Sequence, residues 1–303
     1  MQLFATLVTE SAGSPPVSYT ARAAQSEAEY LRTQIEADRR FAEELRRLFD
    51  SKELRLEQVR EALKLEMPRR REMDLGFDAK LTSFSASAGL GRGLVRVIVV
   101  KTTTGEWITD MVVGFGCAVI FPDGRRPIPA FKAAVRGAGL NPSEERETGF
   151  VFEWRDTVRK DEFNRRMQAL LDGPVVLDGP PLSESLKNAV RLLDSPLLAD
   201  DSVFGVTCGS ASGKLVGRQA IEDIVAAERW DVVRYLLRGL DPVGRLYAAQ
   251  ALMESGKATP GDLRAISTLR SQGTLIQYCG GCEIVKNTMA ALLPKSPDPR
   301  SGN

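Results

Sequence analysis

The stretch IEDIVAAERWDVVRYLLRGLDPVGRLYAAQALMESGKATPGDLRAISTLRSQGTLIQYCGGCEIVKNTMAALL, residues 221–293, carries the clearest structural pattern of the chain. Apolar residues recur at helical spacing over residues 221–237, with charged residues between them. Gly239 stands where this pattern stops, and the pair Asp241-Pro242 follows it. Asp caps helix N-termini and Pro fits the first helical turn, so a second helix is expected from Pro242. The stretch therefore predicts a helical C-terminal region.

The segment LLRGLDPVGRLYAAQALMESG, residues 236–256, resembles one unit of a HEAT-type helical repeat. The resemblance rests on the paired leucines, the Asp241-Pro242 turn, Arg245 four residues after Asp241, and the Ala-rich second helix. A repeat array normally needs three or more units, and one clear unit is evident here. The resemblance implies a helical-hairpin module with a ridged surface, and not a long solenoid.

Four residues of this hairpin region are candidate contacts for a protein partner: Trp230, Arg234, Arg245 and Tyr247. Trp230 is also expected to be buried at the hairpin interface. A non-enzymatic interaction or scaffold protein acting through its helical C-terminal region is the leading hypothesis.

The composition is that of an ordinary globular protein. The 303 residues are 43% hydrophobic and 27% charged. The 41 basic and 40 acidic side chains nearly balance, so the composition does not indicate nucleic-acid binding. The absence of histidine excludes Ser-His-Asp and Cys-His mechanisms and zinc sites with imidazole ligands. No apolar run approaches the roughly 20 residues of a membrane span. No secretory signal pattern is evident at the first residues, so a cytoplasmic protein is expected.

Residues 22–66 have a strongly helical composition. One apolar stripe precedes Asp50 and a second follows it, so two helices are predicted, with Asp50 as the cap of the second. An amphipathic pair packed on its own domain is favoured. The alternative is a coiled-coil arm that oligomerises the protein through residues 22–66.

Strand patterns follow at residues 94–100, 106–120 and 150–154, whereas the Gly-rich residues 81–93 are interpreted as a loop. The predicted fold class is α+β and mostly helical: N-terminal helices with a small antiparallel sheet of three or four strands, then a C-terminal α-helical hairpin region. The predicted divisions are a flexible N-terminus (1–20), a first domain (21–172), a linker (173–182), a helical C-terminal domain (183–293) and a disordered tail (294–303).

A possible phosphate-binding loop lies in VFGVTCGSASGK, residues 203–214, where Gly209, Gly213 and Lys214 are the candidate ligand contacts. Three residues separate the glycines instead of four, and Leu215 follows the lysine where a P-loop has Ser or Thr. An ordinary connecting loop is therefore favoured and no cofactor is predicted. A nucleotide-binding enzyme is the third hypothesis.

Cys279 and Cys282 form a CxxC pair, which is typical of a redox couple or of half a metal site. The other cysteines, Cys117 and Cys208, are single, so no second pair completes a Cys₄ zinc site. Four cysteines allow three full connectivities, and pairing with Cys117 or Cys208 is equally open. A thiol-redox or metal-responsive protein is the second hypothesis.

Overall fold

The computed structural model describes residues 27–121, 124–197, 203–208, 213–280 and 283–293, without the side chains of residues 27, 28 and 66–71. The chain divides into two compact units. Unit 1 consists of Met1–Arg70, Ser83–Arg96 and Met111–Trp154. Unit 2 consists of Arg71–Thr82, Val97–Asp110 and Arg155–Asn303. The predicted domain boundaries differ from this division and stay predictions.

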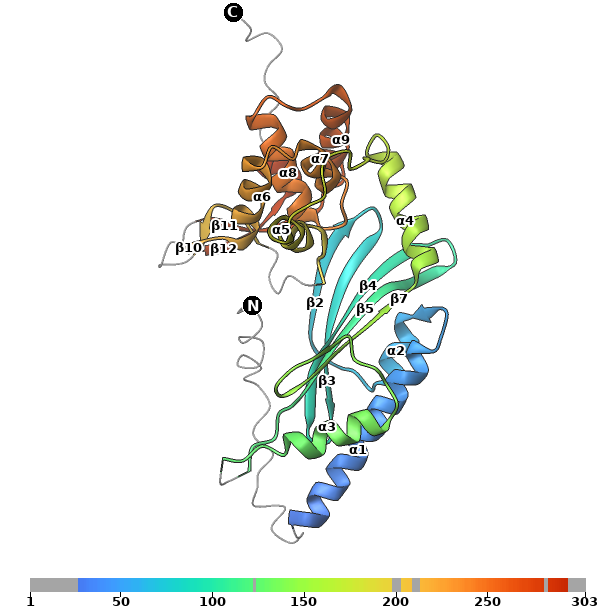
Figure 1. Cartoon of the computed structure of the whole chain (residues 1–303). Helices are drawn as coiled ribbons and strands as arrows, with labels where there is room; N and C mark the ends of the chain where they lie inside the picture. Colours follow the sequence, from blue (N-terminus) through green and yellow to red (C-terminus); the bar gives the residue numbers. More distant parts are fainter. Residues whose placement is uncertain (1–26, 122–123, 198–202, 209–212, 281–282, 294–303) are drawn as a thin grey trace, which may run out of the picture. The chain divides into compact units, whose positions relative to one another are not determined.

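A seven-stranded antiparallel sheet is the main β structure (Figure 1). Its strands are β1 (Leu54–Arg55), β2 (Glu66–Gly76), β3 (Ala79–Ala88), β4 (Gly91–Thr102), β5 (Gly105–Cys117), β6 (Glu144–Glu145) and β7 (Gly149–Arg155). They are hydrogen-bonded in the order β2-β3-β4-β5-β7-β6, and β1 pairs with β5. The four long strands β2 to β5 each contribute residues to both units.

The predicted fold class is wrong in its arrangement, because N-terminal helices with a small sheet are replaced by this large central sheet. Residues 81–93, predicted as a loop, form most of β3 and the start of β4. Leu81, Phe84 and Ala86 are buried there, while small polar residues stand between them. Small and polar residues on the outer positions weaken the strand pattern, so burial of the sheet overrides local propensity.

Glycines in β4 permit close packing in unit 1. A Cβ on Gly91 would lie 2.1 Å from the Phe115 ring, and a Cβ on Gly93 would lie 1.9 Å from the carbonyl oxygen of Gly114. Both positions therefore exclude any side chain. The alternating glycines that indicate a loop from sequence are instead sites of close approach within a strand.

The described residues of unit 1 contain three helices: α1 (Glu27–Phe49), α2 (Leu56–Ala62) and α3 (Ile128–Gly137). The predicted break after Phe49 is present, but β1 fills it, and Arg55 instead of Asp50 is the N-cap residue of α2. Helix α1 packs against α3 and buries Ala42 and Leu45. Aromatic rings join α1, β5, α3 and β7 through the contacts Phe41–Phe115, Phe115–Phe131, Phe131–Phe150 and Phe150–Phe152.

Unit 2 contains the remaining helices of the described chain: α4 (Thr157–Leu170), α5 (Glu184–Asp194), α6 (Val216–Ala226), α7 (Trp230–Leu237), α8 (Pro242–Glu254), α9 (Pro260–Ser271) and α10 (Met289–Leu292). The predicted helix start at Asp241-Pro242 is confirmed, because the Asp241 carboxylate accepts hydrogen bonds from the backbone N–H groups of Val243 and Gly244. Ser183 is the N-cap residue of α5, and its hydroxyl accepts a hydrogen bond from the backbone N–H of Leu186.

Short strands also occur in unit 2: β8 (Val203–Phe204), β9 (Thr207–Cys208), β10 (Gly213–Lys214), β11 (Leu275–Gly280) and β12 (Glu283–Thr288). Strands β12, β11 and β8 form a three-stranded sheet in that order, and β9 pairs with β10. The region after residue 216 is therefore helical only as far as Ser271 before the chain turns into a hairpin of strands.

Candidate functional site

The candidate site is the group of strands β8, β9, β11 and β12 in unit 2, called here the strand platform. Strand β11 is its centre: β12 pairs with it antiparallel on one side and β8 pairs with it parallel on the other. Figure 1 labels β10, β11 and β12 in this region, and β9 pairs antiparallel with β10. Three features set this platform apart: a disulfide, a buried tyrosine and an exposed edge strand.

A disulfide between Cys208 and Cys279 fixes β9 to β11. Their Cα atoms lie 5.6 Å apart, and the bond closes a loop across 71 positions of sequence. Cys279 is buried, and Cys117 is a buried free thiol in β5. Cys282, the predicted partner of Cys279, lies outside the described residues. The structure thus joins Cys279 to Cys208, one of the connectivities that the sequence leaves open.

Tyr247 of α8 is buried against the platform, where it contacts Phe204 and Gly205. Its hydroxyl donates a hydrogen bond to the carbonyl oxygen of Gly205 at 2.8 Å and accepts one from the backbone N–H of Gly205 at 3.1 Å. The Tyr247 ring also packs against Phe204 of β8, with the centroids 4.7 Å apart. Burial raises the pKa of the Tyr247 phenol to about 12. The phenol therefore stays neutral and acts as a fixed donor and acceptor.

Strand β12 lies at the edge of the platform and is exposed along its length except at Asn287. Ile284 is 55% exposed and Val285 is 42% exposed. Among the described residues, β11 is the one strand hydrogen-bonded to β12, so the other edge of β12 carries free backbone groups. An open edge beside exposed apolar side chains is a template for another extended segment.

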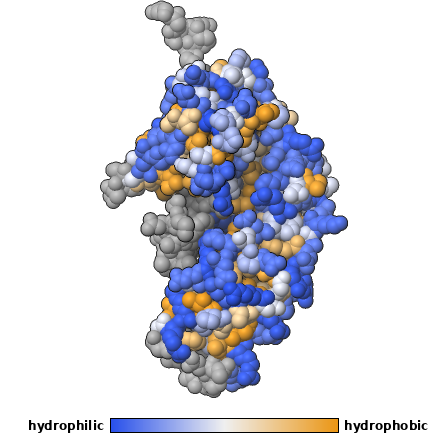
Figure 2. All heavy atoms as spheres, viewed as in Figure 1, coloured by the Kyte–Doolittle hydropathy of each residue, from blue (hydrophilic) through white to orange (hydrophobic). Residues whose placement is uncertain are grey.

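In the view of Figure 2, hydrophilic residues predominate over the helices that Figure 1 labels α6 to α9, with hydrophobic residues scattered among them. Scattered apolar residues are normal on a protein surface and do not by themselves mark a site.

The four predicted partner contacts are mostly structural. Arg245 and Tyr247 are fully buried, so neither can touch a partner in this conformation. Trp230, which is predicted to be buried at the hairpin interface, is half-buried at the start of α7. Arg234 is half-buried and is held by an ion pair. The platform residues Ile284 and Val285 are not among the predicted contacts.

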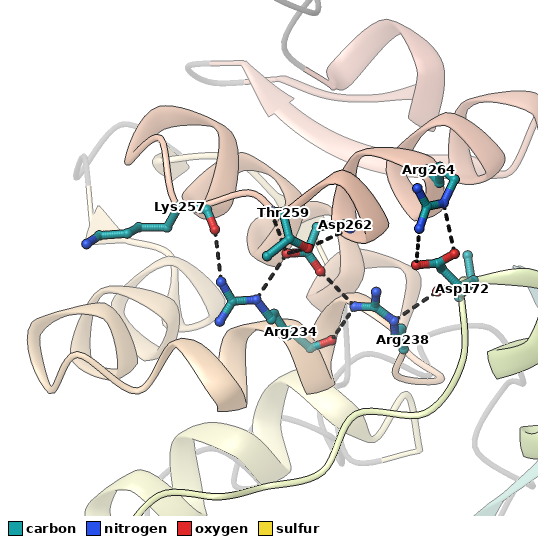
Figure 3. A network of polar contacts seen from close by, with 8 residues as sticks. Asp172, Arg234, Arg238, Lys257, Thr259, Asp262 and Arg264 are labelled. Atoms are coloured by element: carbon teal, nitrogen blue, oxygen red, sulfur yellow. Dashed lines mark hydrogen bonds and ion pairs between the residues drawn. The ribbon is translucent and has the colours of Figure 1, made fainter.

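Arg234 belongs to a polar network centred on Asp262 of α9 (Figure 3). The Asp262 carboxylate accepts hydrogen bonds from Arg234 Nε and Arg238 Nη1, each at 3.0 Å, and also from the hydroxyl of Thr259. Burial raises the pKa of Asp262, but the hydrogen bonds from Thr259 and the two arginines outweigh it and hold the pKa below its usual value. The network joins α7 to α9. These contacts account for the position of Arg234, so no contact with a partner protein is needed to explain it.

Arg245 is a buried cation that joins α8 to the β2–β3 turn of the same unit. Its guanidinium donates to the carbonyl oxygens of Leu75 and Leu240 and lies 5.2 Å from the Phe77 ring centroid. Burial lowers the pKa of Arg245 to about 10, opposed by the charges of Asp241 and Asp74. These contacts account for Arg245 as a structural residue.

The residues predicted to contact phosphate do not form a phosphate-binding loop within the described part of the chain. Gly209 lies outside the described residues, and Gly213 and Lys214 lie in the exposed strand β10. Lys214 Nζ is 2.7 Å from Glu222, which already neutralises its charge. The structure thus gives Lys214 a protein partner where the prediction expects a phosphate.

A cavity of about 350 Å³ in unit 2 is a second place to consider. Its charged lining residues are Glu72, Asp74, Asp78, Lys80, Lys101 and Glu106. Lys80 Nζ lies 3.0 Å from Glu106 and 3.6 Å from Glu72, so its charge is shared between two lining carboxylates. Within the described chain no group of three or more Cys, Asp or Glu side chains could hold a metal ion. The strand platform is therefore the better candidate.

The exposed strand β12 could be found in the sequence only in part. The apolar pair in EIVKNT, which follows two consecutive glycines in the sequence, is a hairpin signal. Residues 221–293 are predicted to be helical because the segments before β12 have a strong helical period, so this prediction misses β12.

No helix among the described residues is long and apolar enough to cross a membrane.

Comparisons with protein-family models, with curated proteins and with solved structures found no match. The HEAT-type resemblance of residues 236–256 gains no support from them.

Proposed function

We propose that this chain is a protein-interaction protein whose C-terminal region binds a partner at the strand platform. The observation that carries the proposal is the open edge of β12 with Ile284 and Val285 exposed beside it. Arg245 and Tyr247 of α8 are buried, so the proposed contact surface does not include them. This keeps the expected interaction role and moves its surface from the helices to the strands.

The test is a comparison of partner capture by matched variants. The double variant Ile284→Ser with Val285→Ser removes exposed apolar area from the platform without touching a buried side chain. The control Val158→Ser removes a residue that is 74% exposed on α4 of the same unit. Proteins enriched by the wild-type chain in quantitative affinity purification from the native host should be lost with the double variant and kept with the control. Equal losses with both variants would contradict the assignment.

The disulfide bears on the compartment in which this binding takes place. Disulfides persist in oxidising compartments and are rare in the cytosol. The Cys208–Cys279 bond therefore favours an oxidising compartment over the cytoplasmic one that the sequence suggests. Alkylation of thiols in intact cells before lysis tests this, because a reduced pair in the cell would restore the cytoplasmic expectation.

A further inference from the structure

Strand β12 has the geometry to accept one more strand. In an antiparallel ladder every second residue directs its N–H and C=O groups away from its neighbour, so β12 presents a row of such groups on the side opposite β11. We infer that β12 binds an extended segment of the partner by strand addition, antiparallel to β12, with an acidic–apolar–apolar–basic order of side chains. This inference rests on the proposed function and names its chemistry.

The side chains of β12 define that order. Glu283 and Lys286 flank the apolar pair Ile284-Val285. Within the described part of the chain, neither charged side chain takes part in an ion pair. An antiparallel partner segment places an acidic residue opposite Lys286, two apolar residues opposite Val285 and Ile284, and a basic residue opposite Glu283. Opposite charges and apolar pairs at directly facing positions are the contacts that stabilise a ladder.

A second copy of this chain cannot provide the same match. In a twofold-symmetric antiparallel pair the symmetry axis is perpendicular to the sheet. Two side chains that face each other across the pair lie on the same face of the sheet. Residues that face each other must then be separated by an even number of positions, because successive side chains alternate between the sides. Glu283 and Lys286 are three positions apart, so a symmetric β12–β12 pair never sets them opposite each other. A symmetric dimer of this chain is therefore excluded as the source of this match, and the occupant that we infer is a segment of a different protein.

The edge is also held ready for binding. Strand β12 is paired with β11 over six positions, from Leu275↔Thr288 to Gly280↔Glu283. The Cys208–Cys279 disulfide and the parallel pairing with β8 hold β11 in turn. A strand that is already ordered loses little conformational entropy on binding, which favours affinity.

The probe is the synthetic hexapeptide Thr-Thr-Glu-Ile-Val-Lys, capped at both ends, which matches Thr288 to Glu283 in antiparallel order. It is titrated into the full-length isotope-labelled chain with its disulfide intact, and amide chemical shifts of β12 are followed. We expect saturable shifts confined to β12 and its neighbours. No shifts on β12 at millimolar peptide would overturn the inference.

Two N-methylated peptides test whether backbone pairing carries the binding. One is methylated on the odd residues and the other on the even residues. A paired strand directs only alternate N–H groups to β12, so one peptide should lose binding and the other should keep it. Equal binding by both would mean that side chains alone dock, which contradicts strand addition.

Charge order is tested by exchange. The peptide Thr-Thr-Lys-Ile-Val-Glu should bind the wild-type chain about threefold or more weakly. The variant Glu283→Lys with Lys286→Glu should reverse this preference. Tighter binding of the exchanged peptide to the wild type would overturn the antiparallel order.

Sedimentation velocity of the chain alone tests the other occupant. A dimer that disappears with Ile284→Lys would assign the edge to a second copy and overturn the inference. Partner capture that still depends on Ile284 and Val285 while the peptides fail would leave the proposed function standing and remove strand addition alone.

Discussion

The carboxylate of Asp38 in α1 accepts a hydrogen bond from the backbone N–H of Leu90 at 3.1 Å, across 52 positions of sequence. The neighbouring N–H of Gly91 binds the other oxygen at 3.0 Å. Asp38 is fully buried, and a Cβ on Gly89 would lie 2.0 Å from the carbonyl oxygen of Gln34. A single acidic side chain thus fastens the β3–β4 turn against α1 within unit 1.

The stability of unit 1 should fall as pH rises toward neutrality because of Asp38. Burial raises its pKa to about 7, against the opposing hydrogen bonds from Leu90 and Gly91. Between about pH 4 and pH 7 the folded state binds more protons at this group than the unfolded state does. Its contribution is therefore complete below the unfolded pKa and is lost as pH rises through the folded one. Urea unfolding at pH 5 and pH 8 should show a smaller difference for Asp38→Asn than for the wild type.

Replacing Arg245 should destabilise the protein strongly. Arg245→Ala removes the donors to the Leu75 and Leu240 carbonyl oxygens and leaves a cavity, so we expect a loss of about 3–5 kcal/mol. Denaturant unfolding measures this. The control Arg264→Ala removes an exposed ion pair with Asp172 and should change stability little. Equal effects of the two variants would contradict the structural role of Arg245.

Breaking the disulfide should also destabilise the folded state. The Cys208–Cys279 bond closes a long loop, so Cys208→Ala should cost about 2–4 kcal/mol. Adding Cys279→Ala should cost little more, since both changes remove one bond. Peptide mapping without reductant should find the Cys208 and Cys279 peptides linked; a Cys279–Cys282 link would show a different connectivity.

Removing the Tyr247 hydroxyl should cost about 1–3 kcal/mol, because Tyr247→Phe leaves the N–H and C=O of Gly205 buried without their partner. Thermal unfolding measures the loss. Amide exchange at Gly205 should quicken in the same variant, and unchanged exchange would mean that another group satisfies this amide.

Local signals predicted some helix starts correctly, such as that of α8 at Asp241-Pro242, but the predicted cap Asp50 is replaced by Arg55. Asp241-Pro242 and Ser183 act through hydrogen bonds within a few residues, so their roles are readable from adjacent sequence. The sheet was underestimated, because what makes β3 a strand is pairing and burial that the local pattern does not show. The strand β2 reads EMPRRREMDLG, which has too many charges and a proline to suggest a long strand by itself.

The candidate site was harder to predict for the same reason. The Cys208–Cys279 contact joins residues 71 positions apart, whereas the CxxC spacing draws attention to Cys282. Arg234 and Arg245 are predicted as partner contacts, yet they donate hydrogen bonds to Asp262 and to the Leu75 carbonyl oxygen within the chain. Exposure of Ile284 depends on β12 being an edge, which no local pattern reveals.

The division of strands β2 to β5 between two units limits how this protein can be cut. Unit 1 is assembled from three separate segments of the chain, and unit 2 from three others. No single cleavage of the backbone releases either unit whole. A truncated chain that starts after Trp154 keeps the helices of unit 2 but loses Arg71–Thr82. This segment contains Leu75, whose carbonyl oxygen accepts a hydrogen bond from Arg245, and Phe77, whose ring lies against the Arg245 guanidinium. Such a fragment would expose a buried cation, so work on the C-terminal region needs the intact polypeptide.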